Sequence, residues 1–340
     1  MTFRTRAAFL ITLLSATPAL ADNCGHLKLW ASLDMTLTRG DAILVPATVN
    51  GTEMHMLLDT GGAVSSLSAK TVKALGLTRQ DAALKLLDVT GNASRQFVRL
   101  NTLELGGLKG KDIALMVAPD PNAPFDGVIA GDILKRYDVE FNFVTRKLNL
   151  FSPDHCEGQV IYWPNTGVAV VPFSMSRPLN SVPGQPVRFQ RMPDTHIRVP
   201  VTLDGKTFSA IIDTGAYNTS MSADTAKSAF DVTADSPGAA PAGFLNGDPK
   251  ARRFGYNFHS LAFEGIAVSN PHVVIFADLI GKKDPDNAFV LGSNIIKTDD
   301  GMGPEVTVGM DVLKRLHVYI AYQEQKLYIT APDQASDASR

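Results

Sequence analysis

Hydrophobic positions along this chain gather in short runs that are rich in β-branched and aromatic residues. Asn-Gly, Asp-Gly and Gly-Gly pairs, which are turn signals, separate many of these runs. The pattern predicts a mostly β protein built from short strands. In the first half we expect strands at 43–49, 54–58, 97–105, 139–143 and 148–151.

Helical signals are few and short. Ser68 can cap a helix over 69–75, and Gly76 can end it. Ser222 stands in the same relation to residues 223–230. We therefore expect a short helix after each of these serines, in a chain that otherwise favours strands.

The chain also matches itself, in two blocks. Shifted by 154 positions, residues 43–51 fall on 197–205, and the LLDTG segment beginning at Leu57 falls on the IIDTG segment beginning at Ile211. A second block, DILKR from Asp132, matches DVLKR from Asp311 at a longer offset, so the second half carries an insertion, which we place within 278–303. Two blocks repeated in the same order predict two copies of one lobe.

The repeat divides the chain into an N-terminal lobe, a connection and a C-terminal lobe, flanked by a leader and a polar tail. We place a strand within the Pro-rich connection, at 168–173. The expected boundaries are 1–21 for a signal peptide, 22–151 for the first lobe, 152–193 for the connection, 194–330 for the second lobe and 331–340 for the tail.

The first residues predict export. Arg4 and Arg6 form a positive region before the apolar run 7–14, and Ala-Leu-Ala at 19–21 fits a signal-peptide cleavage site. The apolar run is shorter than the roughly 20 residues that a spanning helix needs, although an uncleaved anchor is the alternative. We expect a periplasmic or secreted protein with no membrane span after cleavage.

Cys24 and Cys156 are the two cysteines of the chain. In an oxidising compartment they predict one disulfide that ties the mature N-terminus to the end of the first lobe. Two unpaired buried thiols are the alternative.

The composition indicates a folded protein and limits the ligands that we expect it to bind. The chain has 340 residues, of which 45% are hydrophobic and 19% charged, so a packed core is expected. The formal net charge is −2 without a basic block, which argues against nucleic acid as the main partner. The seven histidines are scattered, so we expect neither a metal site nor a cofactor.

The candidate chemistry lies in the repeated Asp-Thr-Gly. Asp59 and Asp213 each follow an apolar strand, where a carboxylate needs support from its surroundings. Glycine permits a tight turn, and threonine supplies a hydroxyl that can fix neighbouring backbone. Related lobes pack about a pseudo-twofold axis, and a residue near that axis meets its counterpart. A pair of solvated turn aspartates is the alternative.

Two carboxylates about 3 Å apart share one proton, because both do not ionise readily. The ionised carboxylate can act as a general base for water, and the protonated one as a general acid. Asp59 and Asp213 therefore predict hydrolysis of an amide bond by an activated water.

These motifs resemble those of a known family. LLDTGGA from Leu57 and IIDTGA from Ile211 are similar to the active-site motifs of the aspartic peptidases, the retropepsins and pepsins. The resemblance covers most of 40–151 and 195–330. It implies an all-β, bilobal fold with two pseudo-twofold-related lobes and short helices, and it makes Asp59 and Asp213 the catalytic pair.

The family motif also includes an apolar-apolar-Gly element later in each lobe. TVG at 307–309 resembles it in the second half, and we prefer this segment to FVLG at 289–292 because the repeat supports it. The first-half equivalent, VIA at 128–130, has alanine in place of glycine, with Gly131 next.

The resemblance further implies loop-supporting residues and a flap, a β-hairpin that closes over the substrate. The first flap is expected at 88–93 and the second, less clearly, at 243–250. By resemblance, the loop-supporting residues are Thr60, Gly61, Thr214 and Gly215, and the flap candidates are Thr90, Gly91 and Asn92.

The function we expect is that of a monomeric endopeptidase acting on polypeptides in the periplasm or outside the cell. One alternative is a catalytically silent relative that binds peptide in the cleft. Another is a structural or assembly protein whose lobes dimerise with another chain.

Overall fold

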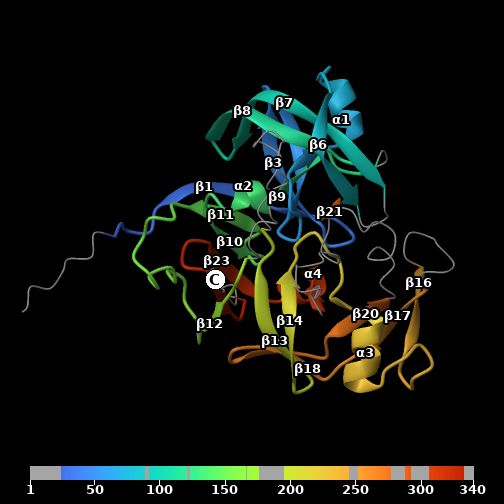
Figure 1. Cartoon of the computed structure of the whole chain (residues 1–340). Coiled ribbons are helices and arrows are strands. Elements are labelled where there is room, and N and C mark those ends of the chain that lie inside the picture. The colour runs from blue at the N-terminus through green and yellow to red at the C-terminus, as the bar shows by residue number, and fades with distance from the viewer. Residues whose placement is uncertain are drawn as a thin grey trace, which may run out of the picture.

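The strands of the described part of the chain form three sheets, as Figure 1 shows in outline. The first lobe lies at the top of that view, the second at the bottom, and a third sheet lies beside both. The computed structural model describes residues 24–88, 92–120, 123–165, 167–175, 195–244, 252–276, 288–291 and 306–332.

The first lobe is a nine-stranded sheet of order β2-β3-β4-β9-β5-β8-β7-β6-β21. Eight of its strands come from the first half of the chain and one, β21, from the second. The strands are β2 (Thr36–Leu37), β3 (Ile43–Val49), β4 (Thr52–Asp59), β5 (Ser66–Leu67), β6 (Gln80–Asp88), β7 (Ala93–Leu105), β8 (Leu108–Val117), β9 (Gly127–Ala130) and β21 (Ala288–Leu291).

The second lobe repeats this plan in a nine-stranded sheet of order β16-β17-β20-β15-β22-β14-β13-β18-β19. Its strands are β13 (Arg198–Leu203), β14 (Lys206–Ile212), β15 (Ser220–Ser222), β16 (Ala240–Phe244), β17 (Arg252–Asn257), β18 (Ser260–Phe263), β19 (Ile266–Ser269), β20 (His272–Phe276) and β22 (Val306–Val308). The expected all-β, bilobal fold is confirmed.

A six-stranded sheet of order β1-β11-β10-β23-β24-β12 joins the two halves. Its central pair is antiparallel, with Phe141 of the first half opposite Val318 of the second. The strand expected at 168–173 is confirmed as β12, which forms one edge. The strands are β1 (Leu29–Asp34), β10 (Asp138–Asn142), β11 (Lys147–Phe151), β12 (Ala169–Pro172), β23 (His317–Ala321) and β24 (Lys326–Thr330).

The local signals for turns and helices are borne out. The turn between β3 and β4 is Asn50-Gly51, and both residues have positive φ (49° and 85°), as a tight hairpin turn requires. Ser68 caps α1 by accepting a hydrogen bond from the Thr71 amide at 3.1 Å. Ser222 caps α3 in the same way. The helices are α1 (Ala69–Ala74), α2 (Gly131–Leu134), α3 (Ala223–Phe230) and α4 (Met310–Leu313).

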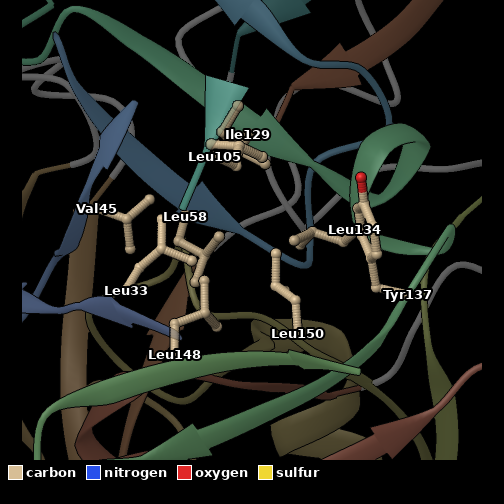
Figure 2. Close-up of a pocket in the computed structure, with 9 residues that line it drawn as sticks. All are labelled: Leu33, Val45, Leu58, Leu105, Ile129, Leu134, Tyr137, Leu148 and Leu150. Carbon is tan, nitrogen blue, oxygen red and sulfur yellow. The ribbon is translucent and has the colours of Figure 1, made fainter. Parts of the chain in front are cut away.

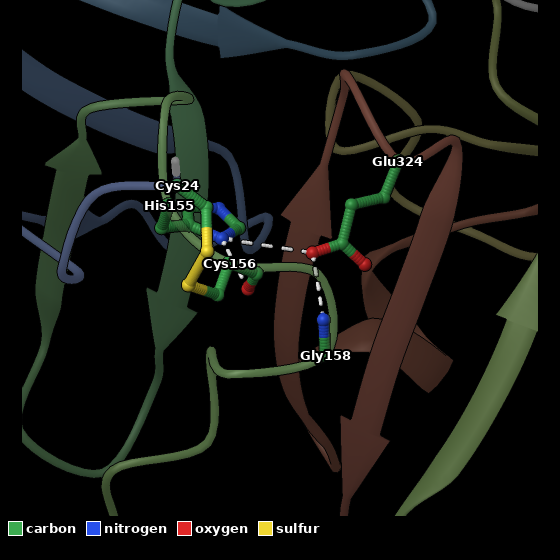
Figure 3. Close-up of a disulfide and its surroundings, with 5 residues drawn as sticks. All are labelled: Cys24, His155, Cys156, Gly158 and Glu324. Carbon is green, nitrogen blue, oxygen red and sulfur yellow. Dashed lines mark hydrogen bonds and ion pairs between the residues drawn. A yellow bond between two sulfur atoms is a disulfide. The ribbon is translucent and has the colours of Figure 1, made fainter. Parts of the chain in front are cut away.

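The predicted disulfide forms between Cys24 and Cys156, whose Cα atoms are 4.8 Å apart. Figure 3 shows that Glu324, in the turn between β23 and β24, lies close to the disulfide segment. Its Oε1 accepts a hydrogen bond from the Gly158 amide at 3.0 Å and lies 3.6 Å from Nδ1 of His155. The end of the first lobe is thereby held to a hairpin of the second half.

Buried ion pairs reinforce the joining sheet. His317 Nε2 of β23 lies 2.6 Å from Glu140 Oε1 of β10, and His155 Nε2 lies 2.5 Å from Asp138 Oδ2. Both histidine rings and both carboxyl groups are almost fully buried, so each polar group needs its partner to offset lost hydration. The sheet is therefore fixed by paired side chains as well as by its backbone ladder.

A small apolar cavity lies between the first lobe and the joining sheet, as Figure 2 shows. Its volume is about 10 Å³, which is about the least that one water needs. Such a space is a packing gap and is too small for a substrate. It is lined by Leu33, Val45, Leu58, Leu105, Ile129, Leu134, Tyr137, Leu148 and Leu150.

Candidate active site

Two strands at equivalent places in the two lobes deliver the predicted aspartates. Asp59 is the last residue of β4 and pairs in parallel with Ala130 of β9. Asp213 directly follows β14, and its amide donates to the Val308 carbonyl of β22 at 3.0 Å. The two side chains are 4% and 1% exposed, so both carboxyl groups are buried.

The loops after these strands bring the two carboxyl groups together. A Cβ placed on Gly61 would lie 2.3 Å from Cγ of Asp213, and one on Gly215 would lie 2.5 Å from Cγ of Asp59. Each glycine thus packs against the aspartate of the opposite lobe, in space that no side chain could share. The two glycines are needed here because of this close approach.

Threonine hydroxyls lock the two loops to each other. Thr60 Oγ1 donates to the Ile212 carbonyl at 2.8 Å, and Thr214 Oγ1 donates to the Leu58 carbonyl at 2.9 Å. Each hydroxyl also accepts a hydrogen bond from the amide of the other threonine at 3.0 Å. These four buried bonds cross between the lobes and hold the aspartates in register.

Backbone amides of the following loop contact both carboxyl groups. Oδ1 of Asp213 accepts hydrogen bonds from the Gly215 amide at 2.8 Å and the Ala216 amide at 3.1 Å, and such donors stabilise negative charge. Burial raises the pKa of Asp59 well above its usual value, and the charge and hydrogen bond of Asp213 raise it further, against backbone hydrogen bonds from Gly62 and Gly61 that lower it. A hydrogen bond between two carboxyl groups requires one of them to hold a proton, so this arrangement is one in which two aspartates can share a proton.

A second layer of hydrogen bonds supports each loop, and our sequence analysis did not identify it. In the first lobe Ser65 Oγ donates to Asp132 Oδ1 at 2.6 Å and accepts from the Ala130 amide at 2.9 Å. Burial raises the pKa of Asp132 to about 6, against the hydrogen bonds from Ser65. This carboxyl group anchors β9 to the loop that follows Asp59.

The second lobe repeats the same layer. Thr219 Oγ1 donates to Asp311 Oδ1 at 2.8 Å and accepts from the Gly309 amide at 3.1 Å. Burial likewise raises the pKa of Asp311. A signal was present in the sequence, because both repeat blocks place a hydroxyl residue and an aspartate at matching positions, among them Ser65.

The preferred apolar-apolar-Gly segment is confirmed. Val306–Val308 forms β22, which pairs in parallel with β14, as β9 does with β4 in the first lobe. The rival segment lies elsewhere, since residues 288–291 form β21 on the first lobe. Alanine at 130 is accommodated because Gly62 faces it: a Cβ on Gly62 would lie 3.2 Å from that of Ala130.

The first expected flap is a hairpin of β6 and β7, with Leu87 opposite Ala93. Asn92 is exposed, whereas Thr90 and Gly91 lie outside the described residues. Leu86 of β6 belongs to the same buried cluster as Ala63 and Val64, which follow the Asp59 loop. The base of this hairpin therefore packs against the candidate site.

The second expected flap, at 243–250, falls between β16 and β17, which also pair as a hairpin. Gly243 and Phe244 are described, and residues 245–250 lie outside the described part. The role of both hairpins as flaps stays a prediction.

Two further properties of the described residues bear on the class of site. No group of three or more His, Cys, Asp or Glu side chains in the described part is placed to hold a metal ion. Among those residues, no helix is long and apolar enough to span a bilayer.

Comparison with known proteins gives one family. A family model described as aspartyl protease matches residues 45–133 and 199–312, which together make up more than half of the chain. Each region contains one Asp-Thr-Gly and its partner strand. A search of curated proteins found no match.

Proposed function

Because the chain belongs to the aspartyl protease family, we propose that it is an endopeptidase that hydrolyses peptide bonds with a water activated between Asp59 and Asp213. The observation that carries the proposal is the buried carboxyl pair, in which each aspartate packs against the glycine of the opposite loop. A monomer suffices, since one chain supplies both carboxyl groups.

In the resting dyad we assign the shared proton to Asp59 and the negative charge to Asp213. Burial and the neighbouring carboxylate favour the neutral form of Asp59. Oδ1 of Asp213 accepts hydrogen bonds from two backbone amides, and it is the carboxyl group that we assign as the base. Oδ1 of Asp59 is buried and meets no N–H or O–H donor from the described residues.

The reaction then needs no covalent intermediate with the protein. Asp213 takes a proton from water, whose oxygen attacks the carbonyl carbon of the peptide bond. Asp59 gives its proton to the carbonyl oxygen. In the tetrahedral intermediate the nitrogen takes the proton held by Asp213, and one hydroxyl returns a proton to Asp59 as the C–N bond breaks. The products are a free amine and a carboxylic acid, and the dyad is restored.

Activity is expected to follow a bell-shaped dependence on pH. Below the lower apparent pKa of the dyad the base is protonated, and above the upper one the shared proton is lost. The raised pKa of Asp59 places the falling limb above the usual pKa range of a carboxyl group.

We further propose that the protein acts in the periplasm or outside the cell. The N-terminal pattern of Arg4, Arg6 and the apolar run 7–14 supports a signal peptide. The disulfide of Cys24 and Cys156 supports an oxidising compartment. Measurement of the N-terminal residue of the protein isolated from its native cell tests this: cleavage after Ala21 is the expected result.

The function is tested by digesting a peptide library with the wild type beside Asp59→Asn and reading the products by mass spectrometry. We expect the wild type to cleave peptides at internal bonds and a statine-type peptide to inhibit that cleavage. We expect the variant to cleave no peptide. The variant must retain the melting temperature and circular dichroism of a folded protein. Absence of cleavage from acid to neutral pH would refute the peptidase.

The same experiment separates the alternatives. A silent peptide-binding relative would bind the statine-type peptide without cleaving the library. An assembly protein would have a mass in solution of two or more chains, whereas the peptidase is expected at the mass of one.

A further inference from the structure

The insertion in the second half of the chain contributes a strand to the first lobe. Strand β21 pairs in parallel with β6, from Ala288 opposite Lys85 to Leu291 opposite Asp88. In sheet order β21 follows β6 and forms the edge of the sheet. The segment therefore covers the edge of β6 that would otherwise be open.

This edge lies beside the candidate active site. Strand β6 is the first arm of the expected flap, and Asp88, the partner of Leu291, is its last residue before the flap turn. Leu86 on the same strand belongs to the buried cluster of Ala63 and Val64, next to the Asp59 loop. Figure 1 shows β21 between the two lobes.

The second lobe offers an internal comparison. Its equivalent hairpin is β16 and β17, and β16 forms the edge of that sheet without a further strand among the described residues. Within the described residues the added strand therefore accompanies the first hairpin alone, and the symmetry of the repeat does not require it.

We propose that the edge of β6 from Lys85 to Asp88 is a binding edge for an extended peptide, and that β21 occupies this edge as an internal competitor of the substrate. Extended peptides bind open strand edges through backbone hydrogen bonds, with side chains adding specificity. The occupying sequence, Ala-Phe-Val-Leu, is apolar and uncharged, so the edge accepts an apolar strand. The proposal rests on the proposed function.

The tether strengthens the competition. A segment on the same chain competes at a raised effective concentration, because its binding is intramolecular. A substrate must therefore displace β21, and activity is expected to rise when that strand is weakened.

A disulfide staple tests the proposal in one direction. Lys85→Cys with Ala288→Cys joins residues that are paired across neighbouring strands, at a Cα separation suited to a disulfide. Binding of a fluorescent statine-type peptide is measured by polarisation, with the staple oxidised and then reduced. We expect at least about tenfold weaker binding in the oxidised form, because the tethered strand is no longer displaced.

The controls are the two single-cysteine variants and the wild type in the same reductant, since the reductant also reaches the native disulfide of Cys24 and Cys156. Peptide mapping confirms which cysteines are joined. Equal affinity of the oxidised and reduced forms would overturn the proposal.

Proline substitution tests the opposite direction. Alternate residues of a strand donate to its neighbour, so either Phe289→Pro or Val290→Pro removes a ladder N–H of β21. We expect the disruptive variant to bind the peptide more tightly and to lower KM, while the other serves as its matched control. Weaker or unchanged binding in both would mean that β21 is a fixed structural strand.

These readouts measure binding, so they remain informative if the wild type cleaves nothing. If the wild type binds the statine-type peptide too weakly to measure, the proposal requires that the disruptive proline variant bind it measurably. Absence of binding in the wild type and in both proline variants would also refute the proposal.

Discussion

The two lobes present the same Asp-Thr-Gly loop but distribute one methyl group differently around it. In the first lobe the loop has Gly62 and the facing strand has Ala130; in the second the loop has Ala216 and the position after the strand is Gly309. A Cβ on Gly309 would lie 2.5 Å from the Asn218 backbone, so alanine does not fit there. The residue type that fits in the loop therefore depends on the residue in the strand that faces it.

The lobes also differ at the next residue. Ala63 is buried in the first lobe, whereas its repeat partner Tyr217 is 49% exposed. The tyrosine ring lies against Gly40 of the first lobe, where a Cβ would be 3.5 Å from it. Nearby, Lys314 pairs with Asp41 at 2.5 Å. The second loop therefore contributes to the interlobe contact through a side chain that the first loop replaces by a methyl group.

The largest effect is expected from the aspartates themselves. Asp59→Asn and Asp213→Asn should each lower kcat by at least about 100-fold, because each removes one half of a shared acid–base pair. The measurement is kcat on a substrate taken from the library digest, with melting temperatures as the control. Substantial activity in Asp213→Asn alone would mean that the two lobes do not build one site.

The two supporting aspartates, Asp132 and Asp311, can be compared through the pH dependence of the free energy of unfolding. The pKa of Asp132 is raised by burial to about 6, so its contribution to stability is complete below the unfolded pKa near 4 and is lost as pH rises through 6. The loss by pH 7 is at most about 3 kcal/mol. Urea unfolding of the wild type and Asp132→Asn from pH 4 to 7 checks this: the variant should show the flatter profile.

Asp311→Asn serves as the comparison from the second lobe, where burial raises the pKa in the same direction. A wild-type profile that rises with pH over this range, and that Asp132→Asn leaves unchanged, would contradict the assignment.

The threonine lock is expected to be symmetric. Thr60→Ala and Thr214→Ala each remove a donor and an acceptor in buried hydrogen bonds between the lobes. Each should cost about 2 kcal/mol of unfolding free energy, and Thr60→Ser, which keeps the hydroxyl, should cost less. A double-mutant cycle measures the coupling. Independent, additive effects would show that the two hydroxyls do not act as one network.

The smallest effect on stability is expected from moving a methyl group between the loop and the facing strand of the first lobe. Gly62→Ala would place a Cβ 2.7 Å from Oδ2 of Asp59 and 3.2 Å from Ala130, and should cost about 1–2 kcal/mol through overpacking. Ala130→Gly in the same chain should recover part of this loss. Ala216→Gly is the control from the second lobe. Thermal unfolding measures all four proteins, and a neutral Gly62→Ala would show that the loop has room to move.

Much of the fold could be predicted from the sequence because its signals are local. The strand at 43–49 and both helix-capping serines, Ser68 and Ser222, lie where residue type and spacing place them. The pairing of the two aspartates could be predicted because the chain is duplicated. Two copies of one lobe related by a pseudo-twofold axis bring equivalent residues together, even when they lie far apart in the sequence.

Other features depend on contacts that no local pattern encodes. The hydrogen bond from Ser65 to Asp132 joins positions 67 residues apart. The repeat gives each of them a counterpart in the second half, but it does not show that the two are partners. The same holds for Gly62 and Ala130. The reason that one is glycine where the other is alanine appears only from their close approach in the folded structure.

By itself, the sequence determined the strand-rich character of this protein, its duplication and the identity of Asp59 and Asp213 as counterparts. The tertiary structure alone decided that β21 would leave its own lobe for the edge of β6. The physical reason is that backbone hydrogen bonding at a strand edge is almost independent of sequence. An apolar strand can pair with any open edge within reach, and only the folded arrangement shows which one it takes.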